Sequence, residues 1–118
     1  MSVLRRKKSD TELYWTSDLT REFGVTPRTL RYYEERGLLH PIRRGTHRRY
    51  PASQRARLAE ILKGKALGLT VAEIAEALIA GDGFVKLSAQ QVEAQLEHLE
   101  RQKAEIEAAI ATLKAHRK

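Results

Sequence analysis

The chain has 118 residues, 42% of them hydrophobic, which suits one small domain with or without an extension. Its net charge of +7 is concentrated in residues 1–50, where 12 basic side chains face 6 acidic ones, and this favours a phosphate-binding surface over an evenly solvated one. The absence of cysteine excludes disulfides and thiolate metal sites, and without a secretory signal or an apolar run of membrane length we expect a cytoplasmic protein.

The first segment, residues 1–13, is predicted to be a flexible basic tail whose arginines and lysines can add contacts to phosphates. Residues 17–23 then predict a short helix, which Thr16 or Ser17 can cap. Leu19 and Phe23 recur at a spacing of four, which places both on one inward face.

A second helix is predicted over residues 27–36. Thr26 suits the N-cap, Pro27 the first helical position, and Gly37 a left-handed residue that ends the helix. Leu30 and Tyr33 face inward. Two short helices joined by a turn with glycine predict a helix-turn-helix.

Residues 41–50, PIRRGTHRRY, are predicted to form a two-stranded wing with Gly45 near its tip. The alternative is a solvated loop. Four arginines within seven residues, directly after a helix-turn-helix, favour the wing, and they are Arg43, Arg44, Arg48 and Arg49.

Two further helices follow. The first is predicted from residue 51 or 52 to 67, ended by Gly68, with a buried stripe of Leu58, Ile61, Leu62 and Ala66. The second opens with a capping box of Thr70 and Glu73 and stops at Gly81, and its inward residues are Val71, Ile74, Ala75 and Leu78. In the next loop we expect packing from Phe84, Val85 and Leu87.

The last predicted helix starts at Ser88, with a capping box through Gln91. A heptad pattern runs along it, with Lys103 in the seam beside Val92, Leu96, Leu99, Ile106, Ile110 and Leu113. One possibility is that this helix folds back on its own domain. The narrow stripe favours a two-stranded coiled coil with a second copy instead.

Together these stretches resemble the MerR family of transcriptional regulators. The resemblance rests on TPRTLRYYEERGLL, on the wing ending in RRY, and on ILKGKALGLTVAEIAEAL. It implies a mainly all-α fold, with a winged helix-turn-helix DNA-binding domain over residues 14–87 and a dimerisation helix over 88–118 in an antiparallel coiled coil. It also implies a homodimer on a pseudo-palindromic promoter, whose over-long spacer is distorted so that RNA polymerase can engage.

Carried over residue by residue, with the arginine-rich wing added, the resemblance gives a set of expected DNA contacts. They are Thr26, Arg28, Thr29, Arg31, Tyr32, Tyr33, Arg43, Arg44, Arg48 and Lys65. His47 is expected on the wing surface rather than at a metal. The short wing is similar to that of regulators of branched-chain amino acid and fatty acid catabolism.

Catalysis is not expected, because the four histidines are scattered and no phosphate-binding glycine loop is present. We expect no cofactor and no metal, and we find no obvious effector site. Two alternatives to a regulator stay open. One is an architectural or excisionase-like DNA-bending protein without effector input, and the other is an adaptor that works through its long helix.

Overall fold

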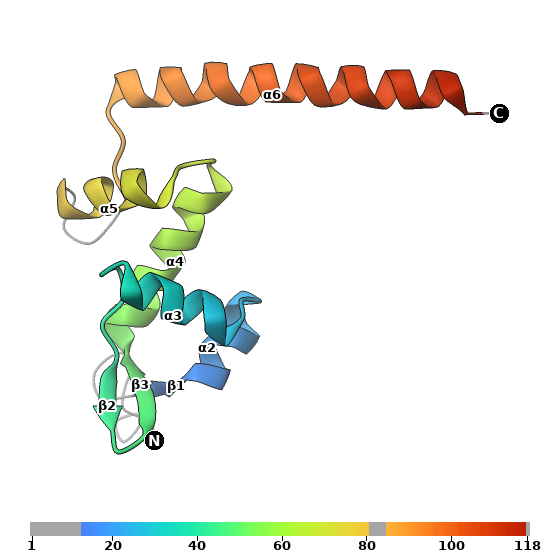
Figure 1. Cartoon of the computed structure of the whole chain (residues 1–118). Helices are drawn as coiled ribbons and strands as arrows, with labels where there is room; N and C mark the ends of the chain where they lie inside the picture. Colours follow the sequence, from blue (N-terminus) through green and yellow to red (C-terminus); the bar gives the residue numbers. More distant parts are fainter. Residues whose placement is uncertain (1–12, 81–84, 118) are drawn as a thin grey trace, which may run out of the picture.

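The computed structural model describes residues 13–80 and 85–117, and the described part is mainly helical. The strands are β1 (Leu13–Trp15), β2 (Ile42–Arg44) and β3 (His47–Pro51). The helices are α2 (Thr16–Phe23), α3 (Pro27–Glu35), α4 (Ala52–Ala66), α5 (Val71–Ala80) and α6 (Ala89–His116). In Figure 1 the sheet lies at one end of the molecule and α6 at the other, with α4 and α5 between them.

The predicted wing is confirmed, and it belongs to a three-stranded antiparallel sheet in the order β1-β3-β2. The prediction of a flexible tail was wrong at Leu13, because β1 pairs with β3 in a register that places Tyr14 opposite Tyr50. A three-residue strand is too short to show a period, and this one is defined by its partner far along the chain. The rest of the predicted basic tail, residues 1–12, lies outside the described residues.

The helix-turn-helix of α2 and α3 forms as predicted, with one change at a cap. Thr26 Oγ1 accepts a hydrogen bond of 3.1 Å from the Thr29 N–H, which confirms this N-cap. At α2 the cap position belongs to Trp15 rather than to Thr16 or Ser17. The Trp15 N–H donates to the Asp18 carboxylate at 2.8 Å, so a side chain inside the first turn reaches back to the cap.

Helices α4 and α5 cross at a glycine. A methyl group on Gly64 would lie 2.8 Å from Ile74 Cγ1, so the two helices approach closely there. This crossing turns Gly64 inward and leaves Ala66 exposed, against the prediction that Ala66 is buried. The capping box at the start of α5 is confirmed, since the Thr70 N–H donates to Glu73 at 2.8 Å and the Glu73 N–H donates to Thr70 Oγ1 at 3.1 Å.

The core joins all of these elements except α6 and β2, whose three residues are exposed. Its fully buried side chains come from both helical pairs, from β3 and from the segment after α3, and they are Leu19, Leu30, Leu39, Tyr50, Leu58, Ile61 and Ile74. Val85 and Leu87 pack against this core as predicted. Phe84, predicted to pack with them, and Gly81, predicted to end α5, lie outside the described residues.

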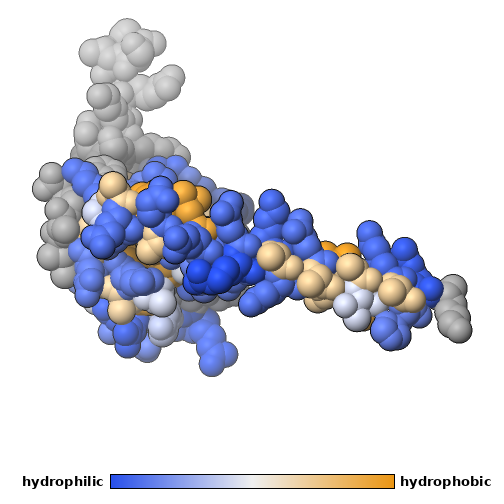
Figure 2. All heavy atoms as spheres, turned by 90° about the horizontal axis from the view of Figure 1, so that it is seen from above, coloured by the Kyte–Doolittle hydropathy of each residue, from blue (hydrophilic) through white to orange (hydrophobic). Residues whose placement is uncertain are grey.

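Helix α6 begins with the predicted capping box, in which the Gln91 N–H donates to Ser88 Oγ at 3.1 Å and the Ser88 N–H donates to Gln91 at 2.8 Å. Its 28 residues span about 42 Å, and none of them is buried. Apolar surface runs along the helix between hydrophilic flanks (Figure 2). The described structure is one chain, so the antiparallel coiled coil stays a prediction.

Within residues 13–80 and 85–117, no helix combines the length and the hydropathy needed to cross a membrane.

Candidate nucleic-acid interface

The outward face of α3 carries three of the predicted DNA contacts. Leu30 and Tyr33 are buried and fix the helix to the core, which turns its other side to solvent. Arg28, Arg31 and Tyr32 lie on that exposed side, and with Glu35 they line a hollow of about 550 Å³. Two guanidinium groups beside a half-exposed phenol ring suit phosphates and base edges.

Tyr33 is predicted to touch DNA, but the structure places it in the core with 5% of its surface exposed. Its ring lies 5.8 Å from that of Tyr32, so it supports the exposed tyrosine from behind. Burial, and then the neighbouring Tyr32, raises the pKa of the Tyr33 phenol, which therefore stays protonated at neutral pH.

Thr26 and Thr29 lie together at the start of α3. Their hydroxyl oxygens are 3.0 Å apart, and Thr26 also accepts the Thr29 N–H. In this structure the two hydroxyls therefore cap the start of α3, next to Arg28.

The wing is held against α3 by an acidic residue that the sequence reading did not select. Glu34 accepts a 2.8 Å hydrogen bond from Arg48 Nε, and its second oxygen lies 3.8 Å from Arg43 Nη2. The side chains of Glu34 and Arg48 are only 22% and 25% exposed, whereas that of Arg43 is 58% exposed. Arg48 thus braces the wing, while Arg43 reaches solvent. Glu34 and Arg48 lie fourteen positions apart in the sequence, so no local pattern predicts the pair.

The opposite side of the wing rests on β1. The guanidinium carbon of Arg49 lies 3.9 Å from the centre of the Trp15 ring, and Arg49 also donates to the Leu13 carbonyl. Trp15 meets His47 edge to face, with 5.5 Å between the ring centres. His47 is exposed, as predicted, and Arg44 is exposed beside it.

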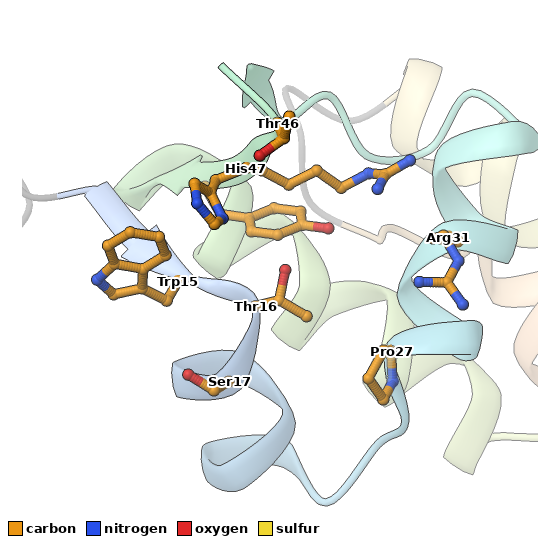
Figure 3. Close-up of a pocket in the computed structure, with 9 residues that line it drawn as sticks. Trp15, Thr16, Ser17, Pro27, Arg31, Thr46 and His47 are labelled. Atoms are coloured by element: carbon orange, nitrogen blue, oxygen red, sulfur yellow. The ribbon is translucent and has the colours of Figure 1, made fainter. Parts of the chain in front are cut away.

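A pocket of about 350 Å³ opens between the wing and the starts of α2 and α3. It is lined by Trp15, Thr16, Ser17, Pro27, Arg31, Thr46, His47, Arg48 and Tyr50. In Figure 3 the labelled side chains of Thr16, Arg31 and His47 surround one common space. The sequence reading missed most of this lining, because three segments that are distant along the chain form it.

Comparison with known families decides the identity. Residues 14–80 match the family described as MerR HTH family regulatory protein, and residues 55–118 match the family described as MerR, DNA binding. The chain belongs to the MerR family. This confirms the resemblance drawn from its sequence, while the assignment to the subgroup of catabolic regulators stays a prediction.

Among solved structures, the MerR chain is similar to that of HiNmlR, a MerR family regulator lacking the sensor domain, bound to promoter DNA. The two are 26% identical, and the match covers 88% of this chain and 81% of the other with a TM-score of 0.48. No curated protein sequence matches this chain significantly.

The remaining predicted contact of this MerR chain, Lys65, lies apart from the others. It is exposed in the last turn of α4, and α4 begins directly after the wing. The 15 residues of α4 span about 22 Å, so Lys65 lies about that far from the wing.

Proposed function

We propose that this MerR family chain is a dimeric, sequence-specific regulator of transcription that binds a pseudo-palindromic promoter and distorts the spacer DNA. The observation that carries the proposal is the exposed Arg and Tyr face of α3, which stands next to a wing braced on the same helix by Glu34. A helix held in this way can enter a major groove while the wing follows the neighbouring backbone.

In this proposal, α3 reads the groove through Arg28, Arg31 and Tyr32, with Thr26 and Thr29 at its start and Tyr33 as support. Arg43, Arg44 and Arg48 meet the backbone from the wing, and Lys65 adds a more distant phosphate contact. We place the protein in the cytoplasm, at the nucleoid, where RNA polymerase responds indirectly through the altered promoter.

Dimerisation is assigned to the unit of residues 88–118, and DNA binding to the unit of residues 14–87. Leu96, Ile106 and Leu113 are 48%, 59% and 71% exposed in the single chain, so a second copy of the same helix would cover them. An antiparallel pair would set the two α3 helices at one separation, which is the property that a promoter with paired half-sites requires.

A titration of duplex DNA selected by the purified protein tests the proposal. Arg31→Ala is expected to weaken specific binding by about 1–3 kcal/mol and leave the fold intact. Arg101→Ala, which removes an exposed arginine of α6, is the matched control and should bind as the wild type does. Equal affinities of the two variants would refute the role of α3.

Transcription in vitro from a promoter with a long spacer separates a regulator from an architectural protein. A regulator changes the amount of transcript when the protein is added. Bent DNA with unchanged transcript levels would favour the architectural alternative.

A further inference from the structure

The hydroxyl of Tyr50 is the starting point. Tyr50 is fully buried near the end of β3, and among the described residues its hydroxyl makes no hydrogen bond of normal geometry, although the Thr16 hydroxyl lies beside it and lowers its pKa. A buried hydroxyl without a well-formed hydrogen bond is destabilising, so native proteins seldom keep one without a reason. Burial, and then the nearby Glu34 carboxylate, raises the pKa of the Tyr50 phenol, so this group remains a hydrogen-bond donor.

The surroundings of Tyr50 indicate an anion. Tyr50 lines the pocket between the wing and the two helix starts, and the Thr16 hydroxyl lies beside its own. The lining includes Arg31, Arg48 and His47 but no carboxylate, and the Glu34 carboxylate next to it is paired with Arg48. The first-turn N–H groups of α2, near Thr16 and Ser17, add a partial positive charge. The nearest acid of α2, Asp18, is bound to the Trp15 N–H.

The position of the pocket indicates which anion fits. It lies between α3 and the wing, and the proposed function places α3 in a major groove and the wing on the neighbouring backbone. The sugar-phosphate strand at the edge of that groove has to pass the space between the two elements.

We propose that this pocket binds one phosphodiester group of the bound duplex through a relay of two hydroxyls. In the complex with DNA, Tyr50 donates to Thr16 Oγ1 and Thr16 donates to a phosphate oxygen beside Arg31, whereas in the free protein the Tyr50 hydroxyl makes no well-formed hydrogen bond. The inference rests on the proposed function and names one phosphate contact within it. Thr16 is the binding residue, and Tyr50 positions the Thr16 hydroxyl.

The relay predicts that Tyr50→Phe has opposite effects on stability and on binding. The free protein should melt at a higher temperature, because an unpaired buried hydroxyl is removed. Affinity for DNA should fall roughly fivefold, the size expected for one hydrogen bond. Tyr14→Phe alters the tyrosine paired with Tyr50 across β1 and β3 and should leave DNA affinity unchanged.

Thr16→Val removes the hydroxyl while keeping the shape of the side chain, and it should cost roughly tenfold in affinity. Because both hydroxyls act on one phosphate, Tyr50→Phe should cost nothing more when Thr16→Val is already present. At one backbone position, a neutral methylphosphonate should weaken wild-type binding more than it weakens binding by the Thr16→Val variant, which keeps only the contact of that phosphate with Arg31.

Three results would overturn the inference. Unchanged affinity in both variants would mean that neither hydroxyl serves the phosphate. A lower melting temperature for Tyr50→Phe would mean that its hydroxyl is bonded within the free protein. Stabilisation of the free protein by inorganic phosphate through Thr16, with no sensitive backbone position in DNA, would assign the pocket to a free anion. If the wild type bound no duplex DNA at all, the proposed function itself would fail.

Discussion

The two ends of the molecule hold their structure in different ways. From β1 to α5, every element except the exposed β2 contributes side chains to one core, and ion pairs connect the wing, including β2, to α3. Helix α6 contributes no buried residue, and apart from the half-buried Leu99 the large apolar side chains of its seam are exposed. The first region is stabilised by contacts within the chain. The second is stabilised mainly by its helix-forming residues and its cap, and most of its apolar seam is not covered by the described chain.

The largest effect is expected from charged substitutions in the apolar seam of α6. Ile106→Asp combined with Ile110→Asp should convert dimers into monomers, because two charges on each helix would face an apolar partner. Both residues are exposed in the single chain, so the DNA-binding unit should remain folded. Light scattering measures the mass.

The matched control is Ala104→Asp combined with Ala111→Asp, which adds the same charges outside the seam. It should remain a dimer. If both double variants have the same mass, the seam lies elsewhere.

A second pair of variants compares how much a buried side chain of the core and an exposed one of α6 contribute to the free energy of unfolding. Leu58→Ala should lower the free energy of unfolding by about 2–5 kcal/mol, because it opens a cavity in the core. In the monomeric Ile106→Asp and Ile110→Asp background, Leu113→Ala should change that energy by less than about 0.5 kcal/mol. Urea titrations give both values, and similar losses would contradict the comparison.

A third prediction concerns the joint between the two regions. Gly68 has φ +87°, and a methyl group there would lie 2.6 Å from Gln95 Nε2 and 3.3 Å from Leu99 Cδ2. Gln95 Nε2 also donates to the Leu67 carbonyl at 2.7 Å. Gly68→Ala should therefore destabilise by about 1–2 kcal/mol through its backbone, and it should also push the Gln95 amide away from the Leu67 carbonyl, which removes one contact that positions α6.

Gly37→Ala is the control, because Gly37 has φ +77° and open space around it. Gly37→Ala should lower the free energy of unfolding by a similar amount and leave unchanged the way DNA affinity depends on the spacing of the half-sites. Gln95→Ala should change that dependence on spacing, as Gly68→Ala should, but with little loss of stability. If neither Gly68→Ala nor Gln95→Ala changes the dependence on spacing, this joint does not set the orientation of α6.

A last and modest effect is expected in the wing. Glu34→Gln should lower stability by about 0.5–1 kcal/mol at low salt, because a partly exposed ion pair with Arg48 is lost. High salt should reduce the difference. Thermal unfolding at two salt concentrations measures it, with Glu35→Gln as the exposed neighbour for comparison. A difference that salt does not change would point to packing rather than charge.

The features that could be predicted from the sequence depend on residues that lie close together along the chain. Thr26, Thr70 and Ser88 predict helix starts because each is hydrogen-bonded to a group three residues away. The wing could be predicted because its segment is rich in arginine. The strand β1, the brace at Glu34 and the pocket at Tyr50 all depend on pairs of residues fourteen or more positions apart, which only the folded chain brings together.

The joint at Gly68 has a further consequence because of the length of the arm attached to it. Helix α6 is a lever about 42 Å long, so a tilt of about 5° at its base would move its far end by about 4 Å. That displacement is close to the width of a methyl group. The contacts of Gly68 and the Gln95 amide at its base therefore bear directly on the orientation of a helix that extends far beyond the core.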